Sequence, residues 1–502
     1  MTSEWHEVPL RELVGYISKG IAPSYAEEAS ETTIRVLNQK CNRNFRISYG
    51  DSRLHDTLKK KVPPERYVKP DDILINSTGA GTAGRIAQIE DVPSATTIDG
   101  HMILRVKKMA QWNRVPLIDY IELIGGGTPK TTVPEYWNGN IPWLSVKDFN
   151  NDKRYVYSTE KHISQSGFEN SPTKMLHKDD IIISARGTVG EIAMIPFDMA
   201  FNQSCYGIRA SRGIDQPFLY YLLKNCISQL KRMTHGSVFD TITRDTFANI
   251  EVDIPDAETQ KRISSVLADI DNKIEVNDAI NDNLEQQAQA IYHERFETIS
   301  PNDLPSEWRI VTLGEVATIS SKSFNPLKEP EILLEHYSIP AFDEARFPVF
   351  ELSTSIKSNK FIIDASCFMI SKLNPTTKRV WKPYCLTGNA VCSTEFIVYK
   401  AKDKTITDFL YSVIDSNSFS DFMCSHVTGS TGSRQRTTPS DTLSYELILP
   451  SEDELAKFQS LVSPMYAQIR INAIENDRLK RLRDSLLPKL MSGEIDVSTI
   501  QL

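Results

Sequence analysis

Two long segments of the sequence carry apolar residues at alternating steps of four and three, which is the spacing of a coiled-coil seam. The first seam consists of Ile263, Leu267, Ile270, Ile274, Asn277, Asn281, Leu284, Ala288 and Ile291. The second follows 195 residues later, at Phe458, Val462, Met465, Ile469, Asn472, Asn476, Leu479, Arg483 and Leu486. Arg483 breaks the pattern, with Leu482 beside it. The spacing predicts two long helices, within residues 257–299 and 451–502.

Both seams carry two asparagines at the same places, Asn277 and Asn281 in the first and Asn472 and Asn476 in the second. A polar residue in a seam costs stability and specifies register. We therefore expect the two helices to pair, against the alternative of two unrelated helices that each pack on their own module. Antiparallel pairing places Asn277 opposite Asn476 and Asn281 opposite Asn472. Parallel pairing also aligns asparagines, so this pattern leaves the direction open.

The ends of both helices carry capping signals. Asp256 is a suitable N-cap for the first helix, and Ser451 with Glu454 has the spacing of a capping box for the second. Pro488 is expected to end or kink the second helix near Leu487, and Gly493 to stop it.

A repeat accompanies the helices. Three segments open as Trp-x-x-Val-x-Leu, at Trp5, Trp112 and Trp308. Each continues to a polar turn, a short β-branched run and a loop: PDDILINSTGAG, KDDIIISARGTVG and the looser IIDASCFMISKLNP. The second and third end in an apolar strand closed by proline, NIEVDIP and SYELILP. The repeat predicts two similar modules over residues 112–255 and 308–450.

The predicted fold is therefore α+β. Two globular α/β-type modules (residues 109–256 and 300–450) are separated by two long helices (257–299 and 451–502), and a partial copy of the module lies at residues 1–108. The first seam spans 28 residues, about 42 Å of helix, which is comparable to the groove repeat of duplex DNA, about 34–36 Å. Two modules on such a spacer suit a target with two sites at a fixed separation.

Composition sets limits on function. The net charge of −8 argues weakly against a simple nucleic-acid binder, although a locally basic face remains compatible with it. The seven cysteines are scattered and form no CxxC pair, which predicts a reduced cytoplasmic chain without a zinc site. No apolar run reaches 18 residues, so we expect no membrane span.

The stretch GGGTPKTT, residues 125–132, looks like a phosphate-binding loop but lacks the GxxxxGK[ST] pattern of one. We interpret the three glycines as positions of close backbone approach or positive φ. Thr128, Lys130 and Thr131 then reach phosphates, whereas Tyr136, Trp137 and Trp143 pack the module core. Further loop residues offer donors for phosphates and base edges: Lys147, Arg186, Gly187, Thr188, Gln203, Ser237, Arg434, Gln435 and Arg436. For each one alone, a solvated surface residue is the simpler interpretation, and only the cluster SRQRTT at 433–438 is denser than a routine loop.

An enzyme is the main alternative. Amino-methyltransferases carry an Asn-Pro-Pro-aromatic motif, and the nearest strings here, Asn325–Pro326 and Asn374–Pro375, lack the second proline. The pairs Asp71–Asp72 and Asp179–Asp180 resemble metal ligands of a nuclease, but their position just before a strand suits turns better. No catalytic or metal-binding residue is therefore predicted. A scaffold built on the coiled coil is the other alternative, and it leaves the duplicated modules unexplained.

Several motifs together resemble the DNA-specificity (S) subunit of type I restriction–modification systems. They are GGGTPKTTVPEYWNGNIPWLSVKDF, KDDIIISARGTVG, HGSVFDTITRDTFANIEVDIP and LRDSLLPKLMSGEIDV, and the resemblance covers residues 112–497. It implies two target-recognition domains that each read half of a split DNA site, and antiparallel helices that set the gap. It also implies docking to two methyltransferase (M) subunits, which use S-adenosylmethionine to methylate adenine, and to restriction (R) subunits, which use ATP and Mg²⁺. The S subunit itself is not catalytic and binds no cofactor.

Residues 1–108 depart from this pattern. They resemble a recognition domain through DGHMILRVK, residues 99–107, and then stop without a counterpart of Gly236–Ser237 or of a spacer helix. We interpret them as a truncated recognition domain of a recombined gene. Three alternatives are open: the segment is poorly ordered, it packs on a neighbouring module, or it blocks the DNA path.

Overall fold

The computed structural model describes residues 14–106, 112–234, 241–329, 331–428, 435–497 and 500. The chain divides into two compact units, residues 1–111 and 112–502. Each mixes strands with helices or helical turns, and in the second unit the parts are a central module (residues 112–255), a C-terminal module (308–450) and a helix pair. Among the described helices, none has an apolar stretch of the length that a transmembrane span needs. All seven cysteines are free thiols.

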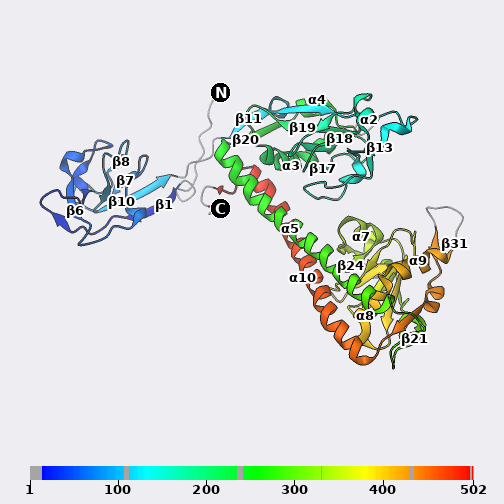
Figure 1. The fold of residues 1–502 in the computed structure, drawn as a ribbon. Coiled ribbons are helices and arrows are strands. Elements are labelled where there is room, and N and C mark those ends of the chain that lie inside the picture. The colour runs from blue at the N-terminus through cyan, green and yellow to red at the C-terminus, as the bar shows by residue number, and fades with distance from the viewer. Residues whose placement is uncertain are drawn as a thin grey trace. The chain divides into compact units, whose positions relative to one another are not determined.

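The helix pair consists of α5 (Ala257–Tyr292) and α10 (Glu452–Met491), which lie side by side in Figure 1. Near its start, α5 shares a buried cluster with the end of α10, through Ile263 and Leu490. Near its end, α5 shares another cluster with the start of α10, through Tyr292 and Phe458. The two helices therefore run in opposite directions, which the seam pattern alone left open.

The seam asparagines bond to each other in the antiparallel register. The Asn277 side-chain amide donates to Oδ1 of Asn476 at 2.9 Å and to the Glu475 carboxylate at 2.7 Å. The Asn472 amide donates to Oδ1 of Asn281 at 2.9 Å. Sliding one helix along the other would bury these amides opposite apolar side chains, and an unpaired buried polar group costs about 1–3 kcal/mol. The four asparagines therefore select one register.

Arg483 occupies its seam position in the structure, although its charge suggested a break in the seam. Its side chain is 3% exposed, whereas Leu482 is 48% exposed and faces solvent. The guanidinium bonds Asp271 of α5 at 2.9 Å and Asp152 of the central module at 2.8 Å. The arginine thus crosses the seam and ties both helices to a loop of the module.

The capping predictions hold in part. The Asp256 carboxylate accepts from two backbone N–H groups in the first turn of α5, as expected. Ser451 accepts from the Glu454 backbone N–H, but the reciprocal half of the predicted capping box is not formed. The Glu454 carboxylate instead pairs with Lys457 at 2.8 Å and with Arg295 at 3.4 Å. Competing cations therefore draw the glutamate away from the helix end.

The prediction that Pro488 ends or kinks the helix near Leu487 is wrong about the end point, because α10 continues to Met491. Proline this close to a helix end removes a single backbone hydrogen bond. Burial of Leu490 and Met491 against the central module outweighs that loss. The backbone N–H of Ser492 closes the last turn on the Pro488 carbonyl, and Gly493, at φ +74°, stops the helix as predicted.

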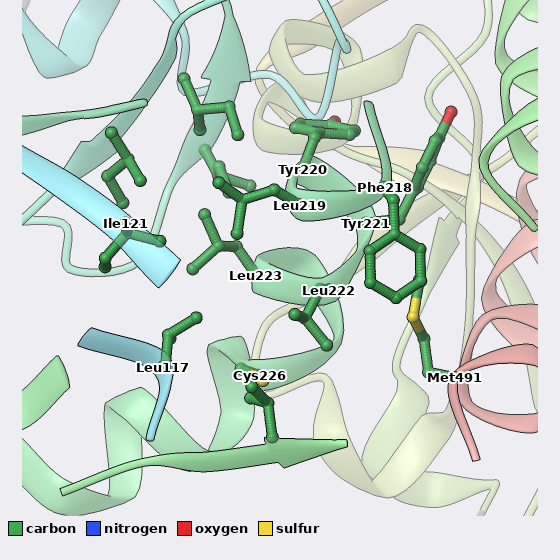
Figure 2. Close-up of a cluster of buried hydrophobic side chains, with 14 of the residues drawn as sticks. Leu117, Ile121, Phe218, Leu219, Tyr220, Tyr221, Leu222, Leu223, Cys226 and Met491 are labelled. Carbon is green, nitrogen blue, oxygen red and sulfur yellow. The ribbon is translucent and has the colours of Figure 1, made fainter. Parts of the chain in front are cut away.

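The central module contains two four-stranded sheets, ordered β12-β19-β16-β17 and β14-β13-β18-β15. The first sheet and its cover consist of β12 (Ile121–Gly125), β16 (Ile181–Ser184), β17 (Ile192–Met194), β19 (Cys205–Ala210) and helix α3 (Gln216–Thr234). The second sheet consists of β13 (Trp137–Leu144), β14 (Lys161–Ile163), β15 (Met175–Leu176) and β18 (Met199–Phe201). Short helices are α2 (Gln165–Glu169) and α4 (Arg244–Ala248). In Figure 2, Leu219 and Leu223 of α3 lie toward Ile121, and Met491 of α10 lies beside Phe218.

The C-terminal module repeats this topology, with sheets β22-β30-β27-β28 and β23-β26-β29-β24-β25. Its strands are β22 (Ala317–Ile319), β23 (Ser323–Phe324), β24 (Leu333–Tyr337), β25 (Val349–Leu352), β26 (Lys360–Ile362), β27 (Cys367–Ser371), β28 (Val380–Trp381), β29 (Ala390–Ser393), β30 (Phe396–Ala401) and the pair β31 (Val427–Thr428) and β32 (Arg436–Thr437). Its helices are α6 (Leu313–Val316), α7 (Ile339–Ala345), α8 (Thr407–Ile414) and α9 (Asn417–Ser425). Helix α8 packs on the first sheet, as α3 does in the central module.

Each of these two modules is closed by pairing its first strand with its last. In the central module β11 (Asn113–Pro116) pairs antiparallel with β20 (Glu251–Ile254). In the C-terminal module β21 (Arg309–Thr312) pairs antiparallel with β33 (Glu446–Leu449). The repeated openings and the proline-closed strands of the sequence are therefore partners, and the long helix of each module starts directly after its closing strand.

The N-terminal unit carries a first sheet of the same strand order, β1-β10-β7-β8, and a second sheet, β2-β6-β3-β9, that shares the parallel strand pair of the other modules. Its strands are β1 (Val14–Lys19), β2 (Tyr25–Ala26), β3 (Thr33–Leu37), β4 (Asn42–Arg43), β5 (Arg46–Ile47), β6 (Arg53–Asp56), β7 (Ile73–Asn76), β8 (Ile86–Gln88), β9 (Thr96–Ile98) and β10 (His101–Val106). Its core is formed by fully buried side chains, among them Leu37, Leu74, Ile98 and Ile103. Residues 14–106 are therefore a folded body with its own core.

Removing the cross-seam arginine is expected to destabilise the junction of α10 and the central module. Arg483→Met keeps most of the side-chain volume but leaves Asp271, itself nearly fully buried, without its cation. Breaking a buried ion pair in this way costs about 3–5 kcal/mol. Native-state hydrogen exchange of the α10 amides reports the local opening free energy. In the matched control Arg481→Met, an exposed pair with Asp477 is lost at a cost below about 1 kcal/mol. Equal effects of the two substitutions would contradict the role of Arg483.

The same junction is expected to weaken in acid. Burial alone would raise the pKa of Asp152, but Lys224 and Arg483 outweigh it and lower the pKa from 3.8 to about 2. A carboxyl with a depressed pKa stabilises the folded state above its unfolded pKa and loses that contribution as pH falls through the folded value. The stability difference between the native chain and Asp152→Asn should therefore be constant from pH 7 to about 5 and shrink between about pH 4 and 2. A difference that stays constant down to pH 3 would count against this pairing.

Candidate nucleic-acid interface

Two parallel strands place the first candidate residues at one edge of the central module. Strands β13 and β18 pair in parallel, so their carboxyl ends lie together, and loops at such ends are the usual ligand sites of parallel sheets. The Asn202 backbone N–H donates to the Leu144 carbonyl at 3.0 Å. Gln203 and Lys147 follow these two ends within a few residues, and both side chains are exposed.

The glycine loop joins this edge through backbone contacts. The Gly127 N–H donates to the Phe201 carbonyl at 2.9 Å. A Cβ atom on Gly126 would lie 2.1 Å from the Asn202 carbonyl oxygen, and one on Gly127 would lie 2.4 Å from the Thr173 nitrogen. Neither glycine has positive φ. Of the two reasons that the sequence offered, close backbone approach therefore applies to Gly126 and Gly127. The prediction is wrong for Gly125, which has neither a close neighbour nor positive φ.

The side chains that follow the glycines face outward from the same edge. The Thr128 hydroxyl hydrogen-bonds Oε1 of Gln203. Lys130 and Thr131 are exposed, and the Lys130 carbonyl accepts from the Trp137 indole at 3.3 Å. The Trp143 indole donates to the Gly127 carbonyl at 3.1 Å. The two indoles thus hold the loop through hydrogen bonds to its carbonyl groups, and Trp143 is buried as predicted.

The loop between β16 and β17 lies next to Gln203. The backbone N–H groups of Ala185 and Arg186 both donate to the Ser204 carbonyl, at 2.8 and 3.2 Å. Arg186, Gly187 and Thr188 are exposed at the tip, and Gly187 has φ +78°. The tip is thus a turn that glycine allows, with a guanidinium and a hydroxyl facing solvent.

A third segment of the chain reaches the same place. Arg186 forms a β-bridge with Thr241, and the Ile242 N–H donates to the Ala185 carbonyl at 3.0 Å. Thr241 directly follows residues 235–240, so Ser237 itself lies outside the described residues. The structure therefore brings Thr128, Gln203 and Arg186 to one end of the central module, from three separate segments.

Lys147 is the one predicted donor of this module with a charged neighbour among the described contacts. Its amine lies 3.8 Å from the Glu160 carboxylate, and both side chains are mostly exposed, at 81% and 59%. An ion pair between exposed groups contributes only about 0–1 kcal/mol. Such a pair gives way readily to a phosphate.

The C-terminal module reproduces the arrangement of loops with different side chains. Strands β24 and β29 are parallel, and the Lys372 N–H donates to the Glu395 carbonyl at 2.9 Å, as Ala185 does to Ser204. Leu373 bridges Arg436, as Arg186 bridges Thr241. The Thr437 N–H donates to the Lys372 carbonyl at 3.1 Å. Hydrogen bonds at the same positions therefore hold the two modules' loops.

Part of the predicted cluster 433–438 makes contacts within its own module. The Arg436 guanidinium makes two bonds to the Glu395 carboxylate, at 3.0 and 3.1 Å, so this arginine is already paired within its module. Gln435 is half-buried, and its carbonyl accepts from the Asn374 N–H at 2.9 Å. Arg434 lies outside the described residues.

Sequence reasoning recognised the start of the loop of residues 372–378 as a looser copy of the repeat but named no candidate site residue in it. This loop is the C-terminal counterpart of residues 185–190, and it exposes Thr376, Thr377 and Lys378. The loop contains no glycine, so it lacks the signal that marked the equivalent loop of the central module. The signal that would have found it is the shared serine, Ser184 in one module and Ser371 in the other, at the end of equivalent strands.

The acidic pairs form turns and not a metal site. Asp71 and Asp179 both have φ +69°, and each donates its N–H across to the neighbouring strand of a hairpin. The second aspartate of each pair binds an arginine, Asp72 with Arg105 and Asp180 with Arg209. Among the residues that the structure describes, no group of acidic, histidine and cysteine side chains is arranged to hold a metal ion.

The fit of the glycine loop can be tested with adjacent glycines. Gly126→Ala should displace the loop or the strand end, because its Cβ would lie 2.1 Å from a backbone oxygen, at a cost of about 1–3 kcal/mol. Gly125→Ala meets nothing within 4 Å and should stay within about 0.5 kcal/mol of the native chain. Hydrogen exchange of the β12 and β18 amides measures both. Equal protection in the two variants would refute the close-approach role.

The family model for the type I restriction modification DNA specificity domain matches residues 109–286, which are the central module and most of α5. The MjaIX specificity subunit of a type I restriction enzyme from Methanocaldococcus jannaschii is 26% identical over 421 residues, covering 78% of this chain and 94% of that protein. The HindI specificity subunit from Haemophilus influenzae is 24% identical over 354 residues, covering 55% of this chain and 77% of that protein.

Among solved structures, the S subunit of a type I restriction–modification system from M. genitalium is similar to 77% of this chain and 98% of its own, at 15% identity and a TM-score of 0.47. The relatives, which match most of the chain, and the family model, which matches the central module, both point to type I DNA-specificity proteins. The central module and most of α5 therefore match the type I restriction modification DNA specificity domain, and the chain is similar over most of its length to type I specificity subunits.

Proposed function

We propose that this chain reads a bipartite DNA target and directs the modification or cleavage of that DNA by partner subunits. The observation that carries the proposal is the pair of modules with equivalent loop edges, joined by helices whose register is fixed by buried asparagines. Each module is followed by a long helix that ends at the other module. Such a chain binds two half-sites at one separation.

Each module supplies the chemistry through loops on a rigid base. In the central module, Lys130, Lys147 and Arg186 are exposed cations on three loops that backbone hydrogen bonds hold together. Cations at such positions contact phosphates, whereas Thr128, Thr188 and Gln203 carry the donors and acceptors that read base edges. In the C-terminal module, Gln435 and the exposed loop of residues 372–378 take the corresponding place.

The helix pair acts as the spacer, an antiparallel coiled coil. Helix α5 has 36 residues, about 54 Å at 1.5 Å per residue. The central module is tied to it through Arg154, which bonds Glu275 at 3.1 Å. The C-terminal module is tied to it through Arg346, which bonds Glu285 at 2.7 Å. These ties fix each module on the spacer and so fix the distance between half-sites.

The catalytic steps fall to partner subunits. This chain is a specificity subunit, as its relatives are named. Its resemblance to the type I specificity-subunit family implies two methyltransferase subunits that use S-adenosylmethionine, and restriction subunits that use ATP and Mg²⁺. We propose that these partners dock on the helix pair and modules while double-stranded DNA lies along the loop edges. The chain itself then needs no cofactor.

The decisive experiment is methylome sequencing of a host that expresses this chain with its cognate methyltransferase subunit. The expected result is a split motif with a methylated adenine in each half. Absence of any modified motif, with both proteins present as a purified complex, would refute the proposal. A change of one base pair in the spacer length should abolish modification, because the helix register sets the gap.

Single cations on the loop edge should change affinity and salt dependence together. Lys130→Ala in the complex with the methyltransferase subunit should weaken DNA binding at low salt and reduce the slope of log K against log salt by about 1, because one phosphate contact is lost. The slope is measured by titrating a labelled duplex at several salt concentrations.

The matched control is Lys178→Ala. Lys178 is an exposed lysine of the same module, but it lies at the start of β16, whereas Arg186 follows the end of that strand. Its substitution should leave affinity and slope unchanged. If both lysines give the same slope change, DNA does not bind at the predicted edge.

A further inference from the structure

The first sheet of the N-terminal unit matches that of the other two modules in strand order and in register. The equivalent cross-strand pairs are Ile75 with Ile86, Ile183 with Ile192, and Ile370 with Val380. The position two residues before the first member of each pair is also apolar: Ile73, Ile181 and Phe368. The three sheets therefore present the same apolar face.

In the central and C-terminal modules a helix covers this face. Ile181 and Ile183 are 0% exposed beneath α3, and Ile192 is 7% exposed. Phe368 and Val380, in the cluster that contains α8, are 0% and 3% exposed. Figure 2 shows the apolar side of α3, with Leu219, Leu222 and Leu223 among its labelled side chains.

In the N-terminal unit the edge strands of this face are open, whereas Leu104 on the central strand β10 is buried. Ile86, the counterpart of Ile192, is 44% exposed, and Ile17 on the neighbouring edge strand is 56% exposed. Ile73 and Ile75 are half-buried. The opposite face of this sheet is packed, since Leu74 and Ile103 are fully buried. The open face therefore belongs to a folded sheet whose other side is already packed.

The chain has little room to supply the missing helix at the equivalent place. In the central module, α3 has 19 residues and starts six residues after β19. In the N-terminal unit, β10 ends at Val106, and only residues 107–111 precede Trp112, where the central module opens. The counterparts of residues 1–13 in the other modules form an edge strand and a short helical turn, β11 and β21 with the residues after them. They do not form the covering helix.

We propose that the open face, formed by Ile17, Ile73, Ile75 and Ile86, binds an amphipathic helix from a different protein and not from a second copy of this chain. The N-terminal unit is then one part of a split module that is completed in trans. The occupant is a helix of the α3 type, about five turns long, with leucine or phenylalanine along one side. This partner follows from the two covered copies of the same face, and it holds whether or not the chain reads DNA.

The α3 sequence itself is a suitable probe, because isoleucine occupies the equivalent positions of both sheets: Ile73 and Ile181, Ile75 and Ile183, Ile86 and Ile192. A fluorescent peptide of residues 216–234 is titrated with the full-length chain and followed by anisotropy. We expect saturable binding, and protection of the β7 and β8 amides from hydrogen exchange. The double variant Ile17→Asp/Ile86→Asp should weaken binding at least tenfold. Because both side chains are already about half exposed, the variant should keep its circular dichroism spectrum.

The control is Phe45→Asp/Leu58→Asp. Both residues are 79% exposed apolar side chains of the same unit and lie off the first sheet, so binding should be unchanged. A peptide with its leucines replaced by aspartate should not bind. No saturable binding to the native chain, or equal binding to both double variants, would overturn the proposal. Self-association of the native chain, seen by light scattering and lost in Ile17→Asp/Ile86→Asp, would also overturn it, because a second copy would then cover the face.

Discussion

Buried amide–amide bonding in the helix seam is the constraint on which the second unit depends. Apolar heptads alone allow two helices to slide past each other in steps of seven residues, because every layer looks similar. Asn277 and Asn476, both almost fully buried, remove that freedom because each has its partner in one register only. Both modules are bonded to these helices through arginines. The position of each loop edge along the spacer therefore follows from four asparagines.

The loop edges themselves depend on a different kind of constraint, which is close backbone packing. In the central module, Gly126 and Gly127 let the loop that carries them pack closely against the backbone of two segments. One segment is Asn202, just after β18, and the other is Thr173. The hairpin loop is held to Ser204 by two backbone hydrogen bonds. Because backbone atoms hold the frame, the side chains on it are free to differ, and the C-terminal module carries the same frame with Lys372, Leu373 and Glu395 in place of Ala185, Arg186 and Ser204.

The sequence predicted features that depend on local pattern. Heptad spacing located both long helices, the asparagine layers gave the possible registers, and the Asp-Asp pairs were correctly interpreted as turns. It failed where a distant group decides the outcome. Arg483 looked like a break in the seam because its partners, Asp271 and Asp152, lie 212 and 331 residues away. Glu454 left its capping position for Arg295, and burial of Leu490 and Met491 carried α10 past Pro488.

The candidate site shows the same division. Loop membership of Thr128, Gln203 and Arg186 followed from glycine and turn signals, but their meeting at one edge required the parallel pairing of β13 with β18, which no local pattern encodes. For Arg436 the basic composition was misleading, since Glu395, in the turn between β29 and β30, neutralises it.

The N-terminal unit separates two requirements that the other modules satisfy together. The inner core, between the two sheets, uses only contacts within residues 14–106, so this part folds without the closing strand or the covering helix. In the complete modules the outer face of the first sheet is buried by segments that come after the last sheet strand and that also lead into the spacer helix. A chain that ends the module after β10 keeps the first requirement and loses the second. It therefore retains a fold but leaves open the sheet face that a helix buries in the other two modules. Burying such a face removes roughly 25 cal/mol of unfavourable hydration free energy per Å² of apolar surface. This gain favours any helix of matching pattern that reaches the sheet.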